Sequence, residues 1–205
     1  MNFNVKAQIV GTTAFDLMYG TSGADYINGH FSPDHIYGLD GDDYLVGSKG
    51  SDLIYGGDGN DVLAPGPHTA QLYGEAGDDV LMHSNDVAVL DGGAGTNDTV
   101  QFQNSQNLII DYATKTIDGI ERIDLTGNLI GAGNTLANLT VADVLTSDNN
   151  TLFVEGDNDA VTTSATWTAG GTVTVNGTAY DKYTAYSGDD LATLYIDTDL
   201  TKTGF

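Results

Sequence analysis

Residues 38–46 read GLDGDDYLV, and residues 56–64 repeat the same arrangement as GGDGNDVLA. Each stretch places glycine at its first and fourth positions, aspartate at its sixth and an apolar residue at its eighth. Glycine permits the positive φ angles of tight turns, and the three β-forming residues at the end favour a short strand whose middle side chain points inward. One nine-residue unit therefore predicts one turn followed by one short strand.

The two stretches belong to a run with a constant period of nine residues. Cut from Gly11, residues 11–100 divide into GTTAFDLMY, GTSGADYIN, GHFSPDHIY, GLDGDDYLV, GSKGSDLIY, GGDGNDVLA, PGPHTAQLY, GEAGDDVLM, HSNDVAVLD and GGAGTNDTV. Position 1 is glycine in eight of these ten units, and position 6 is aspartate in the first six and in the eighth. The regular register indicates a repeat architecture, and we number the units 1 to 10 in chain order.

Two successive units make one coil of 18 residues with two strands, and such coils stack by parallel strand pairing. The position-8 side chains then fill the space between two thin sheets. We expect an all-β chain with a lead-in over residues 1–10, a parallel β-roll of about five coils over 11–100, and a β-rich cap over 101–205. The predicted core column is Met18, Ile27, Ile36, Leu45, Ile54, Leu63, Leu72, Leu81 and Leu90.

The composition restricts the classes of partner. The chain has 29 acidic and 6 basic residues, so its formal charge of -23 opposes compaction and disfavours nucleic acid and anionic membranes as partners. It has no cysteine, which excludes disulfides and thiolate metal sites. It has neither an apolar run of about 18 residues nor the pattern of an N-terminal secretion signal in MNFNVKAQIV. We therefore expect no membrane insertion and no export through an N-terminal signal.

Stacking places the position-6 aspartates of every second unit one above another. Carboxylates this close repel one another strongly, so we expect the coils not to close without a counter-charge. A hard divalent cation between successive turns removes the repulsion, because carboxylates and outward-turned carbonyls are calcium ligands. The repeat therefore predicts Ca²⁺ as the cofactor.

The repeat resembles the RTX family, whose nonapeptide GGxGxDxUx builds a calcium-loaded parallel β-roll. The resemblance covers residues 11–100 and is clearest in GLDGDDYLV, GGDGNDVLA and GEAGDDVLM. It implies a right-handed roll in which each ion lies between one turn and the turn one coil later. The first turn gives the carbonyls of positions 2 and 4 and its aspartate, and the second gives the carbonyls of positions 1 and 3 and its own aspartate.

Carried over residue by residue, this pattern implies ligand sets along the even-numbered units. The first joins Thr21, Gly23 and Asp25 to Gly38, Asp40 and Asp43, and the second joins Leu39, Gly41 and Asp43 to Gly56, Asp58 and Asp61. The third joins Gly57, Gly59 and Asp61 to Gly74, Ala76 and Asp79, and the fourth joins Glu75, Gly77 and Asp79 to Gly92, Ala94 and Asp98. The last acid comes one residue late, so the fourth set departs from the family's pattern.

The even-numbered and odd-numbered units lie on opposite edges of the predicted roll, which we call the even edge and the odd edge. Odd units lack glycine at position 4 in four of five turns, and Ala70 and Ala88 replace the aspartate of units 7 and 9. We therefore predict calcium mainly along the even edge. On the odd edge, Asp16 with Asp34 and Asp34 with Asp52 still provide ligands, and beyond Asp52 the ligands run out.

Two further patterns leave alternatives open. His68 and His83, with Asp86 nearby, predict either a turn that no longer needs calcium geometry or a transition-metal site. A tyrosine recurs at position 9 of units 1, 3, 5 and 7, which predicts a ladder on one outer face. This ladder either stabilises the stacked strands or, with the flanking Leu17, Leu53 and Val89, forms a contact surface for another protein or for the rest of the chain.

After Val100 the period is lost. We expect mainly antiparallel strands there, with a short helix in LTVADVLT, where Thr140 and Asp143 have capping-box spacing. We also expect a strand in NTLFVEGD, a hairpin about Asn176 and Gly177, a final strand in ATLYIDTDL and a core position for Trp167, with a sugar-binding platform as its alternative.

Most of residues 117–200 resembles the C-terminal region of large type I secreted RTX adhesins of Gram-negative bacteria. GIERIDLTG, ADVLT, NTLFVEGD, a tryptophan-containing stretch and VNGTAYDKYTA occur there in this order. The resemblance implies a secreted or cell-surface protein with an uncleaved C-terminal signal that a type I ABC transporter reads. The plainer interpretation is a β-region that closes the end of the roll.

The sequence therefore favours a non-catalytic, calcium-binding C-terminal module of a secreted RTX adhesin that is unfolded in the cell and folds on extracellular calcium. The tail of a secreted RTX hydrolase is the second hypothesis, and the chain holds no HExxH, GxSxG or GxxxxGK[ST] motif of its own. An ice-binding or surface-binding β-solenoid is the third hypothesis, and it would need regular ranks of threonine and asparagine in the turns, which this chain does not have.

Overall fold

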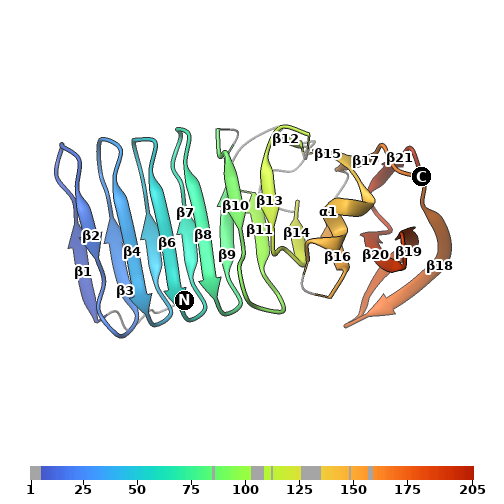
Figure 1. The fold of residues 1–205 in the computed structure, drawn as a ribbon, viewed down its shortest axis with the longest axis horizontal. Coiled ribbons are helices and arrows are strands. Elements are labelled where there is room, and N and C mark those ends of the chain that lie inside the picture. Colours follow the sequence, from blue (N-terminus) through green and yellow to red (C-terminus); the bar gives the residue numbers. More distant parts are fainter. Residues whose placement is uncertain are drawn as a thin grey trace.

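The computed structural model describes residues 6–84, 86–102, 109–111, 113–125, 135–147, 149–156 and 159–205. Figure 1 shows an elongated rod whose strands run across its length and stack from the N-terminal end toward the C-terminal end. An eleven-stranded sheet and a six-stranded sheet form the two walls of the rod, and a four-stranded sheet adds to its C-terminal half.

The repeat region supplies alternate strands to the two walls, in parallel and with 18-residue spacing. Tyr26 pairs with Tyr44 in one wall, and Tyr37 pairs with Tyr55 in the other. The first wall holds β1 (Ala7–Val10), β3 (Asp25–Asn28), β5 (Tyr44–Val46), β7 (Val62–Ala64), β9 (Val80–His83) and β11 (Thr99–Phe102). The second holds β2 (Leu17–Tyr19), β4 (His35–Asp40), β6 (Leu53–Asp58), β8 (Gln71–Ala76) and β10 (Val89–Asp91).

The position-8 side chains form the predicted core column. Met18 is 6% exposed, and the other eight members from Ile27 to Leu90 are fully buried. Because successive strand residues face opposite sides, each three-residue strand places one side chain in this column and two outside it. The parallel β-roll predicted from the period is confirmed.

Parallel pairing continues beyond the repeat, whereas mainly antiparallel strands were expected there. β10 pairs with β13 (Thr116–Asp118), and β11 is followed by β14 (Arg122–Asp124), β16 (Thr151–Glu155) and β20 (Asp190–Asp197), all in parallel. The core column goes on through Ile123, Val154 and Ile196. The period disappears from the sequence because the segments between these strands vary in length, while the strand pairing persists.

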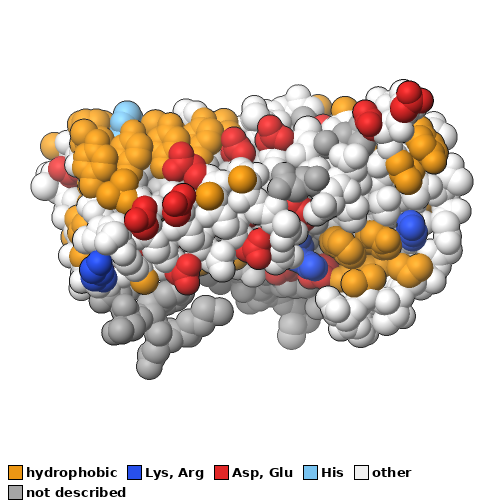
Figure 2. All heavy atoms as spheres, turned by 60° about the horizontal axis from the view of Figure 1, so that its bottom comes forward, with side chains coloured by type: hydrophobic (Ala, Val, Ile, Leu, Met, Phe, Trp, Pro, Cys, Tyr) orange, Lys and Arg blue, Asp and Glu red, His pale blue; other side chains and the backbone are white. Residues whose placement is uncertain are grey.

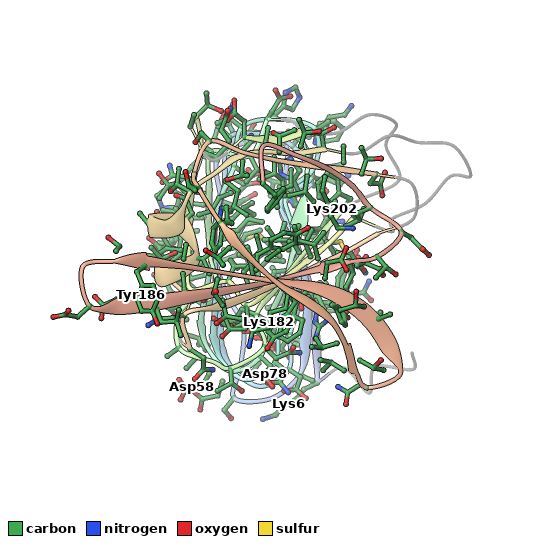
Figure 3. The ribbon with its side chains drawn as sticks, turned by 90° about the vertical axis from the view of Figure 1, so that its right-hand side faces the viewer. Lys6, Asp58, Asp78, Lys182, Tyr186 and Lys202 are labelled. Carbon is green, nitrogen blue, oxygen red and sulfur yellow. The ribbon has the colours of Figure 1, made fainter. Side chains whose placement is uncertain are left out.

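Among the described residues, antiparallel pairing occurs only between β18 (Thr168–Val175), β19 (Thr178–Ser187) and β20 at the C-terminal end of the large sheet. The predicted turn at Asn176 and Gly177 joins β18 to β19, with positive φ at both residues. Figure 3 looks along the rod onto this end and shows the antiparallel strands lying across it, with Tyr186 near the turn that joins β19 to β20. The hairpin therefore covers the last coil of the rod.

The four-stranded sheet and a short helix complete the C-terminal half. The strands β12 (Ile109–Asp111), β15 (Thr135–Leu139), β17 (Ala160–Thr163) and β21 (Thr201–Thr203) pair in parallel. Helix α1 (Val141–Leu145) begins at the predicted capping box, in which Thr140 and Asp143 exchange hydrogen bonds. Trp167 is 6% exposed and donates through Nε1 to Thr163, as expected of a core residue. Among the described residues, no helix has the length and apolarity to cross a membrane.

Candidate metal centre

The even edge carries a continuous column of buried aspartates. The backbone N–H of Asp25 donates to Oδ1 of Asp43, that of Asp43 to Asp61, and that of Asp61 to Asp79, each at 2.7 Å. All of these side chains are at most 1% exposed. One carboxylate oxygen of each aspartate is thus fixed by the preceding coil, which orients the second oxygen.

The second oxygen of three of these aspartates has no partner among the described residues. Oδ2 of Asp43, Asp61 and Asp79 is buried and accepts no hydrogen bond from any described residue. A buried carboxylate oxygen without a donor costs far more than an exposed one, so a stable fold must compensate it with a cation or with a proton. Figure 3 shows Asp58 and Asp78, from two successive even turns, on the same side of the rod.

Glycine at position 1 leaves open the space that these oxygens face. A Cβ atom on Gly38 would lie 2.3 Å from Oδ2 of Asp43 and 2.4 Å from the carbonyl oxygen of Gly56. A Cβ on Gly56 would likewise lie 2.3 Å from Oδ2 of Asp61 and 2.6 Å from the carbonyl oxygen of Gly74. The carboxylate of one turn and the position-1 carbonyl of the next turn therefore converge on one space, which any side chain would fill.

The carbonyls of positions 2 and 4 point the other way along the rod. Leu39 and Gly41 have φ angles of 81° and 120°, a conformation that turns their peptide groups out of the strand direction. A Cβ on Gly57 would lie 1.8 Å from the Leu39 oxygen, and one on Gly59 would lie 2.3 Å from the Gly41 oxygen. The space between two turns thus receives carbonyls from both of them.

A comparison with known families agrees with this geometry. The model of the RTX calcium-binding nonapeptide repeat matches residues 8–36, 37–66 and 71–86. The chain contains an RTX calcium-binding repeat region. No curated protein and no solved structure gives a match.

The residues of the RTX region fit a calcium ion in the even-edge spaces that follow the first coil. The donors that converge there are carboxylates and carbonyls, which are the hard oxygen ligands that calcium takes in sets of six to eight. The structure brings together the turns that carry the predicted sets, from Thr21, Gly23 and Asp25 to Gly92, Ala94 and Asp98, although the individual ligands remain predictions.

Burial controls the protonation of the RTX carboxylates. Removal from water raises the pKa of Asp43 to about 6, of Asp61 to about 7 and of Asp79 to about 8. The backbone N–H that each carboxylate accepts opposes this rise, and the charge of the neighbouring aspartate adds to it. Without a cation, the folded RTX region therefore holds these groups ionised only at a cost.

The first coil differs from those that follow. Thr21 donates its backbone N–H to Oδ2 of Asp25, and on the odd edge Thr12 donates to Oδ2 of Asp16 in the same way. Lys6 lies against Gly23 and donates to Ser22. Protein donors therefore satisfy the aspartates at the N-terminal end of the RTX region, where the sequence predicts the same site as in later coils.

The late acid of unit 10 does join the even column. The backbone N–H of Thr96 still pairs with Asp78, 18 residues earlier, whereas that of Asp79 donates to Oδ1 of Asp98 at 2.7 Å. Asn97 is thus the additional residue, and the chain recovers its register directly after it. The fourth predicted site has its second carboxylate in place.

Sequence reasoning missed two groups of residues on this edge. Glu121 continues the column, because its Oε2 accepts the backbone N–H of Asp98 at 3.0 Å, and it is 5% exposed. Its position, 23 residues after Asp98, hides it from a search for a period of nine. The second group is an outer ladder at position 5 of the even units, in which backbone N–H groups donate to side chains one coil earlier: Asn60 to Asp42, Asp78 to Asn60 and Thr96 to Asp78.

The odd edge has a shorter column with the same local geometry. The backbone N–H of Asp16 donates to Asp34, and that of Asp34 to Asp52, and Oδ2 of Asp34 and of Asp52 is buried without a partner among the described residues. The column ends there, because Ala70 and Ala88 follow at the equivalent positions and pair through their backbones. Burial raises the pKa of Asp52 to about 6.

His68 and His83 do not form a metal cluster. His83 is fully buried and packs edge-on against Phe102, whereas His68 is exposed beside a groove that Asp86 also lines. Within the described ranges, no group of three or more His, Cys, Asp or Glu side chains has a metal-binding arrangement. The structure supports the alternative of a turn without calcium geometry.

The predicted tyrosine ladder is present on the six-stranded sheet. The rings of Tyr19, Tyr37, Tyr55 and Tyr73 stack with centroid distances of 5.1, 5.0 and 4.9 Å. Figure 2 shows hydrophobic side chains gathered over these N-terminal coils. Because the inner rings use both faces on each other, only their edges are exposed, which favours the strand-stabilising interpretation.

Proposed function

We propose that the chain is the non-catalytic, calcium-binding C-terminal module of a secreted RTX adhesin, and that it leaves the cell unfolded and folds on extracellular calcium. The observation that carries the proposal is the column of buried carboxylates, because Oδ2 of Asp43, Asp61 and Asp79 accepts no hydrogen bond from any described residue. A fold that encloses such groups depends on a ligand from outside the chain.

The concentration of calcium supplies the switch. Extracellular calcium modules typically bind with a Kd of about 10⁻⁴ to 10⁻³ M, well above cytosolic calcium levels. Inside the cell, fifteen acidic residues against one lysine in residues 11–100 keep the repeat region extended. Outside, the binding of each ion adds directly to the free energy of folding.

The C-terminal half supports a coupled folding unit. Its strands β14, β16 and β20 extend the same hydrogen-bonded wall that begins at β1, so order gained in the repeat region can propagate toward the hairpin. We assign the type I signal to this C-terminal half on the resemblance of residues 117–200 to secreted adhesins. A transporter that reads the signal on an unfolded chain is compatible with a chain that folds only when it binds calcium outside the cell.

Circular dichroism of the whole chain tests calcium-dependent folding. We expect a disordered spectrum in chelator and a β spectrum in millimolar calcium, with magnesium at the same concentration as the control, because magnesium dehydrates reluctantly and demands stricter geometry. An unchanged β spectrum in chelator would reject the proposal.

Export and the adhesin assignment need separate tests. Co-expressed with a type I ABC transporter, the full chain should appear in the medium, and a chain ending at residue 189, which lacks β20 and β21, should stay in the cell. Transporter-independent export of both would contradict the assignment. For the adhesin, tandem β-sandwich repeats encoded upstream would support the proposal, and a catalytic domain there would replace it with a secreted hydrolase.

A further inference from the structure

The odd edge has one further space that the sequence predicts to be without an ion, between units 5 and 7. Asp52 is 1% exposed, and its Oδ2 accepts no hydrogen bond from any residue that the structure describes. Its Oδ1 accepts the backbone N–H of Asp34, so the carboxylate is held by the coil before it and its second oxygen is left for the coil after it.

This oxygen points into a cradle of the kind found on the even edge. A Cβ on Gly47 would lie 2.4 Å from Oδ2 of Asp52 and 2.8 Å from the carbonyl oxygen of Pro65. Pro65 occupies position 1 of unit 7, where other units have glycine. Its backbone carbonyl can still face the cradle, because every residue type has a backbone carbonyl. A carboxylate and a carbonyl of successive turns converge here in the same relation as Asp43 and Gly56.

A second carbonyl also faces this space. Ser48 has a φ of 69°, and a Cβ on Gly66 of the next coil would lie 1.8 Å from the Ser48 oxygen. This is the relation that Leu39 has to Gly57 on the even edge. The second carboxylate is missing, because Ala70 occupies its place.

The following space, between units 7 and 9, shows what the protein does when no ion is needed. There the Ser84 hydroxyl donates to the carbonyl oxygen of Gly66 at 3.0 Å. A side chain of unit 9 therefore satisfies the position-2 carbonyl of unit 7, which points toward it. Asp52 has no such donor. A groove of about 530 Å³ opens beside the space, with Gly50, His68, Thr69 and Asp86 among its lining residues.

We propose that the odd edge binds a further calcium ion between units 5 and 7, held by the single carboxylate of Asp52 and by the carbonyls of Ser48 and Pro65, with water from the groove completing its coordination. The donors are hard oxygen atoms, which calcium prefers, and one carboxylate in place of two makes this ion the weakest bound. The inference rests on the proposed calcium-dependent fold.

The Ala70→Asp variant tests the site by restoring the missing carboxylate. The number of calcium ions bound at saturation, measured by native mass spectrometry on the whole chain, should equal that of the wild type, and the weakest ion should bind about tenfold more tightly. If the variant binds one ion more than the wild type, the space holds none in the natural sequence and the inference is wrong. A wild type that binds no calcium would reject the proposed function as well.

A blocking variant gives an independent count. Gly47→Ala places a Cβ in the cradle and should lose one ion relative to the wild type, whereas Gly170→Ala, whose Cβ would meet nothing closer than 3.5 Å, should lose none. An unchanged ion number in a folded Gly47→Ala chain would overturn the inference. If Gly47→Ala does not fold, the comparison of Ala70→Asp with the wild type still decides.

The open coordination of the ion has its own readout. Tb³⁺ can replace calcium, and its luminescence lifetimes in H₂O and D₂O report the number of bound waters. We expect the total for the loaded chain to fall by about one in Ala70→Asp, because the added carboxylate displaces water. An equal number of bound waters in both proteins would contradict a site completed from the groove.

Discussion

The two edges of the roll share one backbone plan and differ in their acids. On the even edge, carboxylates follow one another without a gap from Asp25 to Glu121, whereas on the odd edge they stop at Asp52. The strands on either side of Ala70 and Ala88 nevertheless keep their parallel register. Strand stacking and the apolar core therefore do not need the acids. We infer that the acids serve calcium binding. Past Ala70, where the odd edge has no aspartate at position 6, the Ser84 hydroxyl donates to the carbonyl oxygen of Gly66 instead.

Acid should have the largest effect, and mainly through the even edge. The pKa of Asp61 is about 7 and that of Asp79 about 8 in the fold, against 3.8 for the ordinary group, so the metal-free folded state binds more protons than the unfolded state. The stability that these protonated groups contribute is then fully present below pH 3.8 and is lost as the pH rises through about 7 to 8. We expect the chelated chain to gain β signal by circular dichroism when the pH is lowered from 8 to 4. A β signal that does not change over this range would contradict the account.

Filling one even-edge cradle should come next. The Gly56→Ala variant places a Cβ within 2.6 Å of two oxygen atoms, and we expect it to lose about 1–3 kcal/mol of unfolding free energy in calcium. The control Gly170→Ala has room for its Cβ and should stay within about 0.5 kcal/mol of the wild type. Denaturant unfolding in saturating calcium measures both. Equal losses in the two variants would show that the cradle has no special role.

Removing one carboxylate charge from each edge should change the calcium dependence of folding by different amounts. Asp61→Asn keeps an oxygen for the N–H of Asp43 and removes the charge next to two ions, so we expect the calcium concentration at the folding midpoint to rise about tenfold, or about 1.4 kcal/mol. Asp16→Asn, at the partly exposed end of the odd column, should shift this midpoint less than about threefold. A calcium titration followed by circular dichroism compares them. A larger shift for Asp16 than for Asp61 would reverse the ranking of the edges.

The smallest effect should come from the tyrosine ladder. Tyr55 stacks on two neighbours and Tyr19 on one, so Tyr55→Leu should cost about 0.5–1.5 kcal/mol more unfolding free energy than Tyr19→Leu. Thermal unfolding in saturating calcium measures the difference. If Tyr19→Leu costs as much, or if either variant is as stable as the wild type but loses a binding partner, the ladder is a contact surface instead.

The sequence predicts the roll well because one period controls both its turns and its core. The nine-residue register is enough to place Ile54 inward, Tyr55 outward and Asp52 at the turn. The register fails as a predictor where the spacing in the sequence departs from nine residues although the stacking of the coils continues. Asn97 shifts the sequence register by one residue without moving Asp98 from its column, and Glu121 joins the column after a longer coil.

The C-terminal half was harder to predict for a related reason. Its strands β14, β16 and β20 add to the roll in parallel, but the segments that join them differ in length, so no period reveals the pairing. Short-range sequence patterns still predict local structure in this half. The capping box at Thr140 and the turn at Asn176 depend on adjacent residues only, and both were found from the sequence.

The positions of the ions in a calcium-bound crystal structure, located by anomalous scattering, test the central claim most directly. We predict ions in the even-edge spaces bounded by Asp43, Asp61, Asp79 and Asp98, and on the odd edge none beyond the space between Asp52 and Ala70. Ions along the odd edge past Ala70, or an even edge without ions, would contradict it.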